Sequence, residues 1–176
     1  TVTEHYDKLL LAPGAHPLVP PIPGIQHEAI HTIRTVEDAE AVKQAAVRLG
    51  KGAQAVVVGG GFIGVEMAEN LVERGLSVHL AEAAPQILLP FDADLAHLLA
   101  EEMEAHGVRL HLGNGVQEFR KQPKGVVVVL ADGTELPADL VVLAIGVRSD
   151  TAFLKGSGIE LDARGHIIVD EYLQTN

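Results

Sequence analysis

The 176-residue sequence predicts an α/β fold in three layers, with a small antiparallel β-meander added to it. Three observations lead to this prediction. Short continuous apolar runs alternate with amphipathic stretches, as in a parallel sheet whose strands are buried on both faces. A glycine-rich turn joins the apolar run at 53–58 to a helical pattern at 62–74. Turn residues then divide the stretch from 116 to 136 into short strands.

The first elements lead into this α/β unit. Residues 6–12 are mostly apolar and predict a short strand. The five prolines between residues 13 and 24 predict an extended connector. A helix is then expected at 35–49, because Thr35 and Asp38 resemble a capping box and apolar residues follow at helical spacing.

The remaining elements are assigned by the same criteria. Four buried strands are expected in the parallel sheet, at 53–58, 76–82, 108–112 and 139–145. A helix that begins at Asp92 or Asp94 and stops at Gly107 is expected to turn four residues inward: Leu95, Leu98, Leu99 and Met103. The meander is assigned to 116–119, 126–130 and 134–136, and the tail at 160–170 to a hairpin.

Composition excludes several kinds of function. The chain has no cysteine, which rules out disulfides, thiolate metal sites and thiol chemistry by its own residues, and fits a reducing, cytoplasmic location. A formal net charge of -11 disfavours nucleic acid and anionic membranes as partners. No apolar run approaches the roughly 20 residues of a membrane span. His27 and His31 have helical i, i+4 spacing, but no third ligand converges on them, so no metal site is expected.

Three glycines carry the strongest functional signal. Gly59, Gly61 and Gly64 fit the pattern G-x-G-x-x-G between a strand and a helix, which predicts a Rossmann-like dinucleotide-binding domain. In such a turn the first glycine permits the tight bend, the second lets a pyrophosphate approach the backbone, and the third lets helix and strand pack closely. Gly60 completes the turn, and the N–H groups around Phe62 and Ile63 are expected to face the phosphates.

An acidic residue stands where such a domain binds the adenosine ribose. Glu82 ends the next apolar run, 18 residues after Gly64, close to the expected spacing of roughly 20. A carboxylate there accepts hydrogen bonds from the ribose and repels a 2′-phosphate. No arginine or lysine occurs among the next four residues. The sequence therefore predicts NAD(H) rather than NADP(H).

Four segments, in order, resemble the NAD domain of the pyridine nucleotide-disulfide oxidoreductases, flavoproteins that bind two dinucleotides. The first is 6–17, followed by Ile-Pro-Gly at 22–24, and the second is the glycine turn at 59–66. The third is Ala-Asp-Gly-Thr-Glu-Leu at 131–136, and the fourth is Asp-Leu-Val-Val-Leu-Ala-Ile-Gly-Val-Arg at 139–148. The chain is most similar to the subgroup of coenzyme A-disulfide reductases, NADH oxidases and NADH peroxidases.

The resemblance implies a role for further residues. Phe62 would lie where the family has an aromatic ring over the nicotinamide pocket, and Glu66 near the carboxamide. Gly146 and Val147 would approach the nicotinamide from the opposite strand. Simpler readings stay open for three of them: Phe62 as a core residue, Glu66 as a first-turn acid favoured by the helix dipole, and Gly146 as an ordinary strand end.

The resemblance also implies a domain organisation. Residues 1–34 would lead in from a FAD domain, 35–146 would form the NAD(H)-binding domain, and 147–176 would return toward the FAD domain. The family's FAD fingerprint, redox cysteine and C-terminal dimer domain have no counterpart in this sequence. We therefore expect a piece of a longer homodimeric, FAD-dependent oxidoreductase, with no catalytic residue of its own and no turnover in isolation.

Two other functions fit part of the pattern. A non-catalytic, NAD-responsive binding module would need the same glycine turn and no flavin site. A methyltransferase also pairs a glycine turn with a strand-end acid, although the meander at 116–136 argues against it. A short-chain dehydrogenase is disfavoured because neither tyrosine begins a Tyr-x-x-x-Lys motif.

Overall fold

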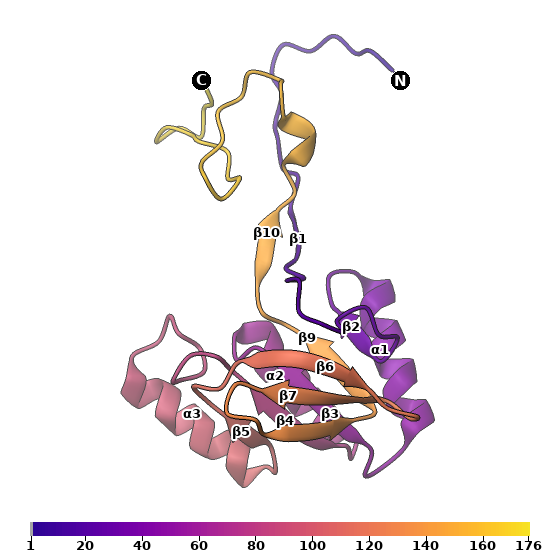
Figure 1. Cartoon of the computed structure of the whole chain (residues 1–176). Helices are drawn as coiled ribbons and strands as arrows, with labels where there is room; N and C mark the ends of the chain where they lie inside the picture. Colours follow the sequence, from indigo (N-terminus) through magenta and orange to yellow (C-terminus); the bar gives the residue numbers. More distant parts are fainter. Residues whose placement is uncertain (1) are drawn as a thin grey trace. The chain divides into compact units, whose positions relative to one another are not determined.

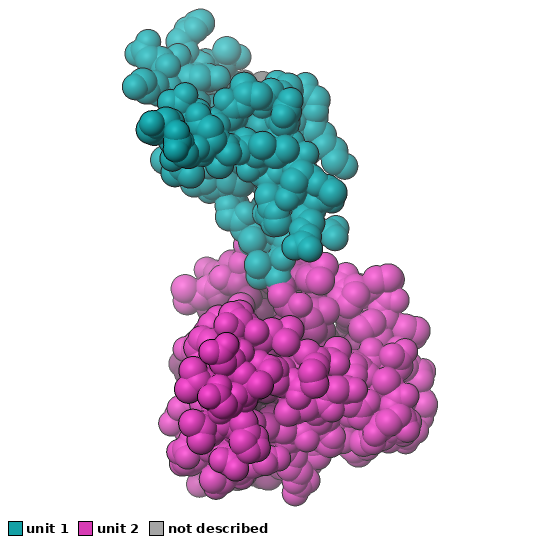
Figure 2. All heavy atoms as spheres, turned by 90° about the vertical axis from the view of Figure 1, so that its left-hand side faces the viewer, with its two compact units in different colours: residues 1–16, 147–176 teal, residues 17–146 magenta. Residues whose placement is uncertain are grey.

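The computed structural model describes residues 2–176 and divides into two compact units (Figures 1 and 2). The larger unit is residues 17–146, and the smaller one combines residues 2–16 with 147–176. The larger unit contains the glycine turn and the acidic residue that the sequence singles out.

A five-stranded parallel sheet forms the middle layer of the larger unit, in the order β2-β9-β3-β4-β5. Its strands are β2 (Ile30–Thr32), β3 (Gln54–Val58), β4 (Ser77–Ala81), β5 (Arg109–His111) and β9 (Leu140–Leu143). The central strands β3 and β9 are almost entirely buried, which explains their continuous valine and leucine runs. Four of these strands are the predicted ones. The edge strand β2 is an addition, because its three residues, Ile-His-Thr, are not part of a longer apolar run.

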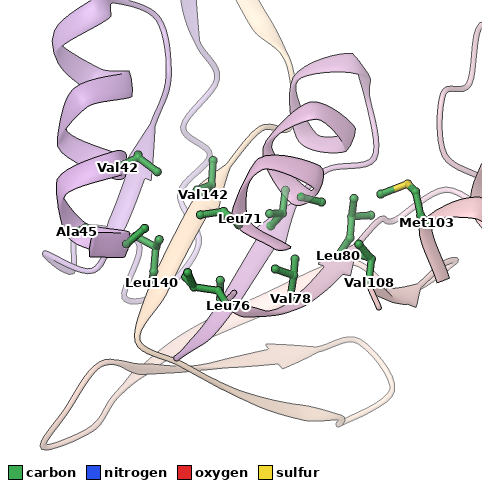
Figure 3. Packing of buried hydrophobic residues seen from close by; sticks show 14 of the residues in the cluster. Val42, Ala45, Leu71, Leu76, Val78, Leu80, Met103, Val108, Leu140 and Val142 are labelled. Atoms are coloured by element: carbon green, nitrogen blue, oxygen red, sulfur yellow. The ribbon is translucent and has the colours of Figure 1, made fainter. Parts of the chain in front are cut away.

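Three helices cover one face of this sheet (Figure 1). They are α1 (Val36–Leu49), α2 (Phe62–Glu73) and α3 (Ala93–Ala105). Figure 3 shows their apolar side chains against alternate residues of the strands, with Leu71 of α2 between Val142 and Leu80. Thr35 begins α1 in the predicted capping box, since its side chain accepts from the Asp38 N–H and Asp38 accepts from the Thr35 N–H.

The predicted meander covers the other face. The antiparallel strands β6 (Val116–Lys121), β7 (Val126–Leu130) and β8 (Glu135–Ala138) form a separate three-stranded sheet. Val126, Val128 and Phe119 pack against the residues of β3 and β9 that point away from the helices, such as Val56 and Val141. The three layers are therefore helices, parallel sheet and meander.

The smaller unit has little regular structure. β1 (Ala15–Pro17) pairs with β10 (Val147–Ser149), and a 3-10 turn, η1, spans Ala152–Leu154. Among the described residues of this unit, only Thr151 and Leu154 are buried. The predicted strand at 6–12 is wrong, because these residues lie outside any strand and Leu9 and Leu10 are exposed. The predicted hairpin at 160–170 is reduced to one antiparallel bridge, between Leu161 and Ile167.

Helix α3 differs from the prediction in its buried face. Ala96, Ala100 and Met103 face the core, whereas Leu95 and Leu98 are 55% and 61% exposed. Ala96 and Ala100 form much of the buried face, and Leu95 and Leu98 lie together on a neighbouring face that is turned outward. The prediction is confirmed for Met103, and Leu99 is partly buried against the core, but it is wrong for Leu95 and Leu98 and it overlooked the alanines. None of the helices within residues 2–176 is long and apolar enough to cross a bilayer.

Candidate functional site

The strand order brings three strand ends together at one edge of the sheet. β3 lies between β9 and β4, and all three run in the same direction, so the residues that follow them are neighbours. The Gly59 N–H donates to the Ala81 carbonyl (2.8 Å) at the end of β4. The Ala144 N–H donates to the Val58 carbonyl (2.7 Å) at the end of β3. Such a carboxyl edge is where open α/β sheets bind their ligands.

Two of the glycines are required by the turn itself. Gly59 has φ 106°, in the region that favours glycine, and a Cβ there would overlap the Ala144 carbonyl. A Cβ on Gly64 would overlap the Gly59 carbonyl. Gly64 thus lets α2 lie against the end of β3, which is the role that its spacing predicts.

The other two glycines differ in their surroundings. A Cβ on Gly60 would lie 2.9 Å from a side-chain carbon of Ile87 and 3.2 Å from one of Glu82, so the side chains of these two residues leave little room for one. A Cβ on Gly61 would have no atom within 4 Å among the described residues. Gly61 therefore faces open space, and a ligand could approach its backbone closely.

Helix α2 begins directly at this open space. Gly61 is its N-cap, and no side chain within residues 2–176 caps it, in contrast to the capped α1. The N–H groups of the first helical turn, at Phe62, Ile63 and Gly64, lie before the first intrahelical donor, Val65, which bonds the Gly61 carbonyl (3.0 Å). Free N–H groups and the positive end of the helix dipole suit an anion such as a pyrophosphate.

Glu82 is bound to the turn by its side chain. One carboxylate oxygen accepts from the Gly60 N–H (2.6 Å) and the other from the Ala84 N–H (2.7 Å). A carboxylate offers about four acceptor positions, so about two stay open for hydroxyl groups of a ligand. The carboxylate consequently has two roles. It presents acceptors beside the glycine turn, as the spacing predicts, and it also holds the turn in place, which the spacing alone did not predict.

Phe62, Ile63 and Glu66 lie on the first two turns of α2. Phe62 is 60% exposed and is not a core residue, so the simpler reading of it is wrong. Glu66 lies beyond the first turn, which has no acidic residue, so its alternative as a first-turn acid is also wrong. Ile63 and Glu66 line one end of a groove of about 440 Å³ between α1 and α2.

Gly146 follows β9 at the same edge and has φ 115°. A Cβ on Gly146 would have no neighbour within 4 Å among the described residues, so its backbone is accessible. Val147 begins β10 in the smaller unit and is exposed. The structure thus groups Gly59, Gly60, Gly61, Glu82 and Gly146 at one edge of the larger unit.

One residue at this edge was missed. The Phe91 ring lies edge-on to the Phe62 ring, with centroids 5.8 Å apart and planes at 79°. Phe91 closes the loop between β4 and α3 and immediately precedes Asp92, the N-cap of α3. No local sequence pattern identifies this contact, because Phe62 and Phe91 belong to different elements.

Comparison with known proteins agrees with this geometry. The sequence profile of the family "Pyridine nucleotide-disulphide oxidoreductase" matches residues 1–176. Subunit epsilon of an NADH-dependent phenylglyoxylate dehydrogenase from Aromatoleum evansii is 39% identical over 171 residues, which cover 97% of this chain and 39% of that protein.

Solved structures show the same fold. Reduced Bacillus anthracis CoADR-RHD superposes with a TM-score of 0.85 at 43% identity, over 93% of this chain and 29% of that one. The water-forming NADH oxidase of Lactobacillus brevis, bound to NADH, superposes with a TM-score of 0.88 at 33% identity. The match covers 98% of this chain and 37% of that one. An engineered variant of this oxidase, bound to NADPH, has a TM-score of 0.88 at 31% identity, with the same coverage of both chains.

The chain spans about two fifths or less of these proteins. The family match nevertheless extends over its full length, and the fold and the glycine turn agree with it. The chain belongs to the pyridine nucleotide-disulphide oxidoreductase family.

Proposed function

We propose that this chain is the NADH-binding domain of a FAD-dependent oxidoreductase. The observation that carries the proposal is the open backbone at Gly61, in front of the uncapped N-terminus of α2 and beside the Glu82 carboxylate. An open glycine, free N–H groups and an acid are the three features that a bound dinucleotide requires.

Each part of the cofactor has a proposed partner. The pyrophosphate would accept from the N–H groups at the start of α2, and the adenosine ribose would donate to Glu82. The nicotinamide would extend toward the end of β9. The complete proposed set is Gly59, Gly60, Gly61, Phe62, Ile63, Gly64, Glu66, Glu82, Gly146 and Val147. Val147 enters this set through the family resemblance alone.

NADH is proposed over NADPH because of charge. Glu82 would repel a 2′-phosphate, and Ala83, Ala84, Pro85 and Gln86 offer no cation to bind one. The NADPH-bound Lactobacillus brevis variant supports this reasoning, since its substitutions remove an aspartate and introduce two arginines.

The flavin would be held outside this sequence. Bound FAD would supply the acceptor for hydride from NADH, and the residues described here would bind and orient the dinucleotide. We place the FAD domain in the same longer cytoplasmic chain, joined through 1–34 and 147–176, and that chain in a homodimer. Exposed apolar residues in the smaller unit support a missing neighbour, among them Leu10, Phe153 and Tyr172. The isolated chain should bind NADH without turning it over.

Calorimetric titration of the purified chain tests this proposal. NADH should bind, and NADPH should bind at least about tenfold more weakly, a difference of about 1.4 kcal/mol. The double variant Glu82→Ala, Ala83→Arg should reverse or abolish that preference. Absence of NADH binding, or NADPH binding as tightly as NADH, would contradict the proposal.

A further inference from the structure

Two of the four phenylalanines of this chain are exposed at the candidate site and touch each other. Phe62 is 60% and Phe91 43% exposed. An edge-on aromatic pair is attractive beyond the apolar area that it buries. This contact is therefore strong enough to select one orientation of the Phe62 side chain.

The loop that carries Phe91 is fastened to the glycine turn by its backbone. The Leu88 N–H donates to the Gly60 carbonyl (2.7 Å), and the Leu88 carbonyl accepts from the Phe91 N–H (2.8 Å). The Gln86 side-chain amide donates to the Phe91 carbonyl (3.0 Å). Ile87 is fully buried beneath Gly60. The position of Phe91 relative to the phosphate-binding turn is thus fixed by four contacts.

The same loop holds a strained residue. Leu88 has φ 46°, a left-handed backbone conformation that is unfavourable for a residue with a Cβ. Leu88 is also almost fully buried, so packing maintains this conformation. Strain of this kind concentrates at ligand clamps and switch regions, where the surrounding structure holds it in place.

The strand order gives the contact a direction. The loop from Glu82 to Phe91 leaves β4, on one side of β3, whereas Gly146 follows β9 on the other side. Phe62 stands at the start of α2, after β3, between the two. A contact with Phe91 therefore draws the Phe62 ring to the β4 side and leaves the accessible backbone of Gly146 uncovered.

We propose that Phe91 is a positioning residue for the dinucleotide, which acts by holding the Phe62 ring on the β4 side of the turn. This keeps the β9 side open for the nicotinamide, an inference that rests on the proposed function. Phe91 itself does not contact the nicotinamide. Without it, the Phe62 ring is free to swing over Gly146, and NADH must displace it on binding.

The experiment compares NADH with ADP-ribose, which lacks the nicotinamide but keeps the ribose and pyrophosphate. Phe91→Ala should weaken NADH binding by about two- to tenfold, the range that corresponds to one aromatic pair. ADP-ribose affinity should not change. In a Phe62→Ala background, Phe91→Ala should have no further effect on NADH affinity, because the ring that it positions is gone.

Two further variants complete the design. Phe91→Leu keeps apolar volume and provides a test if the alanine variant does not fold. Leu98→Ala is a matched control at an exposed apolar residue and should change neither the NADH affinity nor the ADP-ribose affinity. Equal losses for NADH and ADP-ribose in the Phe91 variants, or an undiminished NADH affinity, would overturn this inference and leave the proposed function standing. Absence of NADH binding to the unaltered chain would overturn both.

Discussion

At the scale of single residues, the glycine turn shows that one motif can combine several physical demands. Gly59 supplies a backbone conformation, Gly64 removes a steric overlap, and Gly61 leaves room for a ligand. Glu82 connects these roles, because its carboxylate binds the turn that it stands beside. Structural and ligand-binding demands can therefore be separated by substitution.

Alanine at Gly64 should mainly reduce stability, whereas alanine at Gly61 should mainly weaken NADH binding. Gly64→Ala should lower the free energy of unfolding by about 1–3 kcal/mol, because its Cβ overlaps the Gly59 carbonyl. Gly61→Ala should change stability by less than about 0.5 kcal/mol. It should nevertheless weaken NADH binding, since the methyl group enters the space assigned to the pyrophosphate. Urea unfolding and calorimetry on both variants measure this; equal stability of the two would contradict it.

At the scale of elements, α3 shows why a helical pattern alone does not identify the buried face. Two faces of this helix are apolar, one with alanines and Met103 and one with Leu95 and Leu98. Periodicity predicts a helix equally well for either. The choice depends on how closely the helix approaches the sheet, and that distance is a tertiary property.

Substitutions on the two faces of α3 should separate them clearly. Leu98→Gln should change the free energy of unfolding by less than about 0.5 kcal/mol, because its side chain is largely in water already. Met103→Ala should cost about 2–5 kcal/mol, because it leaves a cavity in the core. Denaturant unfolding monitored by circular dichroism compares the two. A larger loss for the leucine variant would contradict the assigned face.

Most of the fold could be predicted because each predicted element has a strong local pattern. The four predicted strands of the parallel sheet, the capping box of α1 and the meander are examples. The apolar run at 6–12 has the same local pattern as a strand but no partner strand in this unit. β2 and β10 are only three residues each, and their existence depends on neighbours far away in sequence.

Some residues of the candidate site could likewise be predicted from the sequence, and others could not. Gly59, Gly61, Gly64 and Glu82 could be recognised because their spacing reflects one continuous strand-turn-helix-strand unit. Phe91 could not, because its contact with Phe62 depends on the course of the loop between them. The role of Glu82 in holding Gly60 also needs coordinates, since the acceptor and donor are 22 residues apart.

At the scale of the whole molecule, half-buried histidines tie stability to pH. His79 and His111, on adjacent strands, share a ring-nitrogen hydrogen bond of 2.9 Å, and Arg109 donates to the other nitrogen of His79 (3.3 Å). Burial, and then the neighbouring His111 and Arg109, lower the pKa of His79. Burial likewise lowers the pKa of His111, against the opposing effect of Asp132.

The sign of the pH dependence follows from these shifts. The pKa of His31 is also lowered, by burial and by Arg48, so the unfolded chain binds more protons than the folded one below about pH 6.5. The melting temperature should therefore fall as pH is lowered from about 7.5 to about 5.5. Carboxylates with lowered pKa values, such as Asp38 and Asp132, contribute only at lower pH, since their ordinary value is 3.8.

Calorimetric melting across this pH range, on the unaltered chain and on the double variant His79→Gln, His111→Gln, measures the effect. The variant should show a shallower pH dependence, because glutamine does not titrate. Leu98→Gln, on the exposed face of α3, introduces a glutamine without removing a histidine, so it is the matched control and should keep the original slope. An equal slope in the unaltered chain and the double variant would contradict the assignment.

The central claim is that NADH binds across the carboxyl edge of the sheet at the glycine turn. The most direct test is a titration of the ¹⁵N-labelled chain with NADH, followed through its backbone amide resonances. The account predicts the largest shifts at Gly60, Gly61, Phe62, Ile63 and Gly146, with smaller ones in the meander and in α1. Saturable shifts centred elsewhere, or none at millimolar NADH, would contradict it.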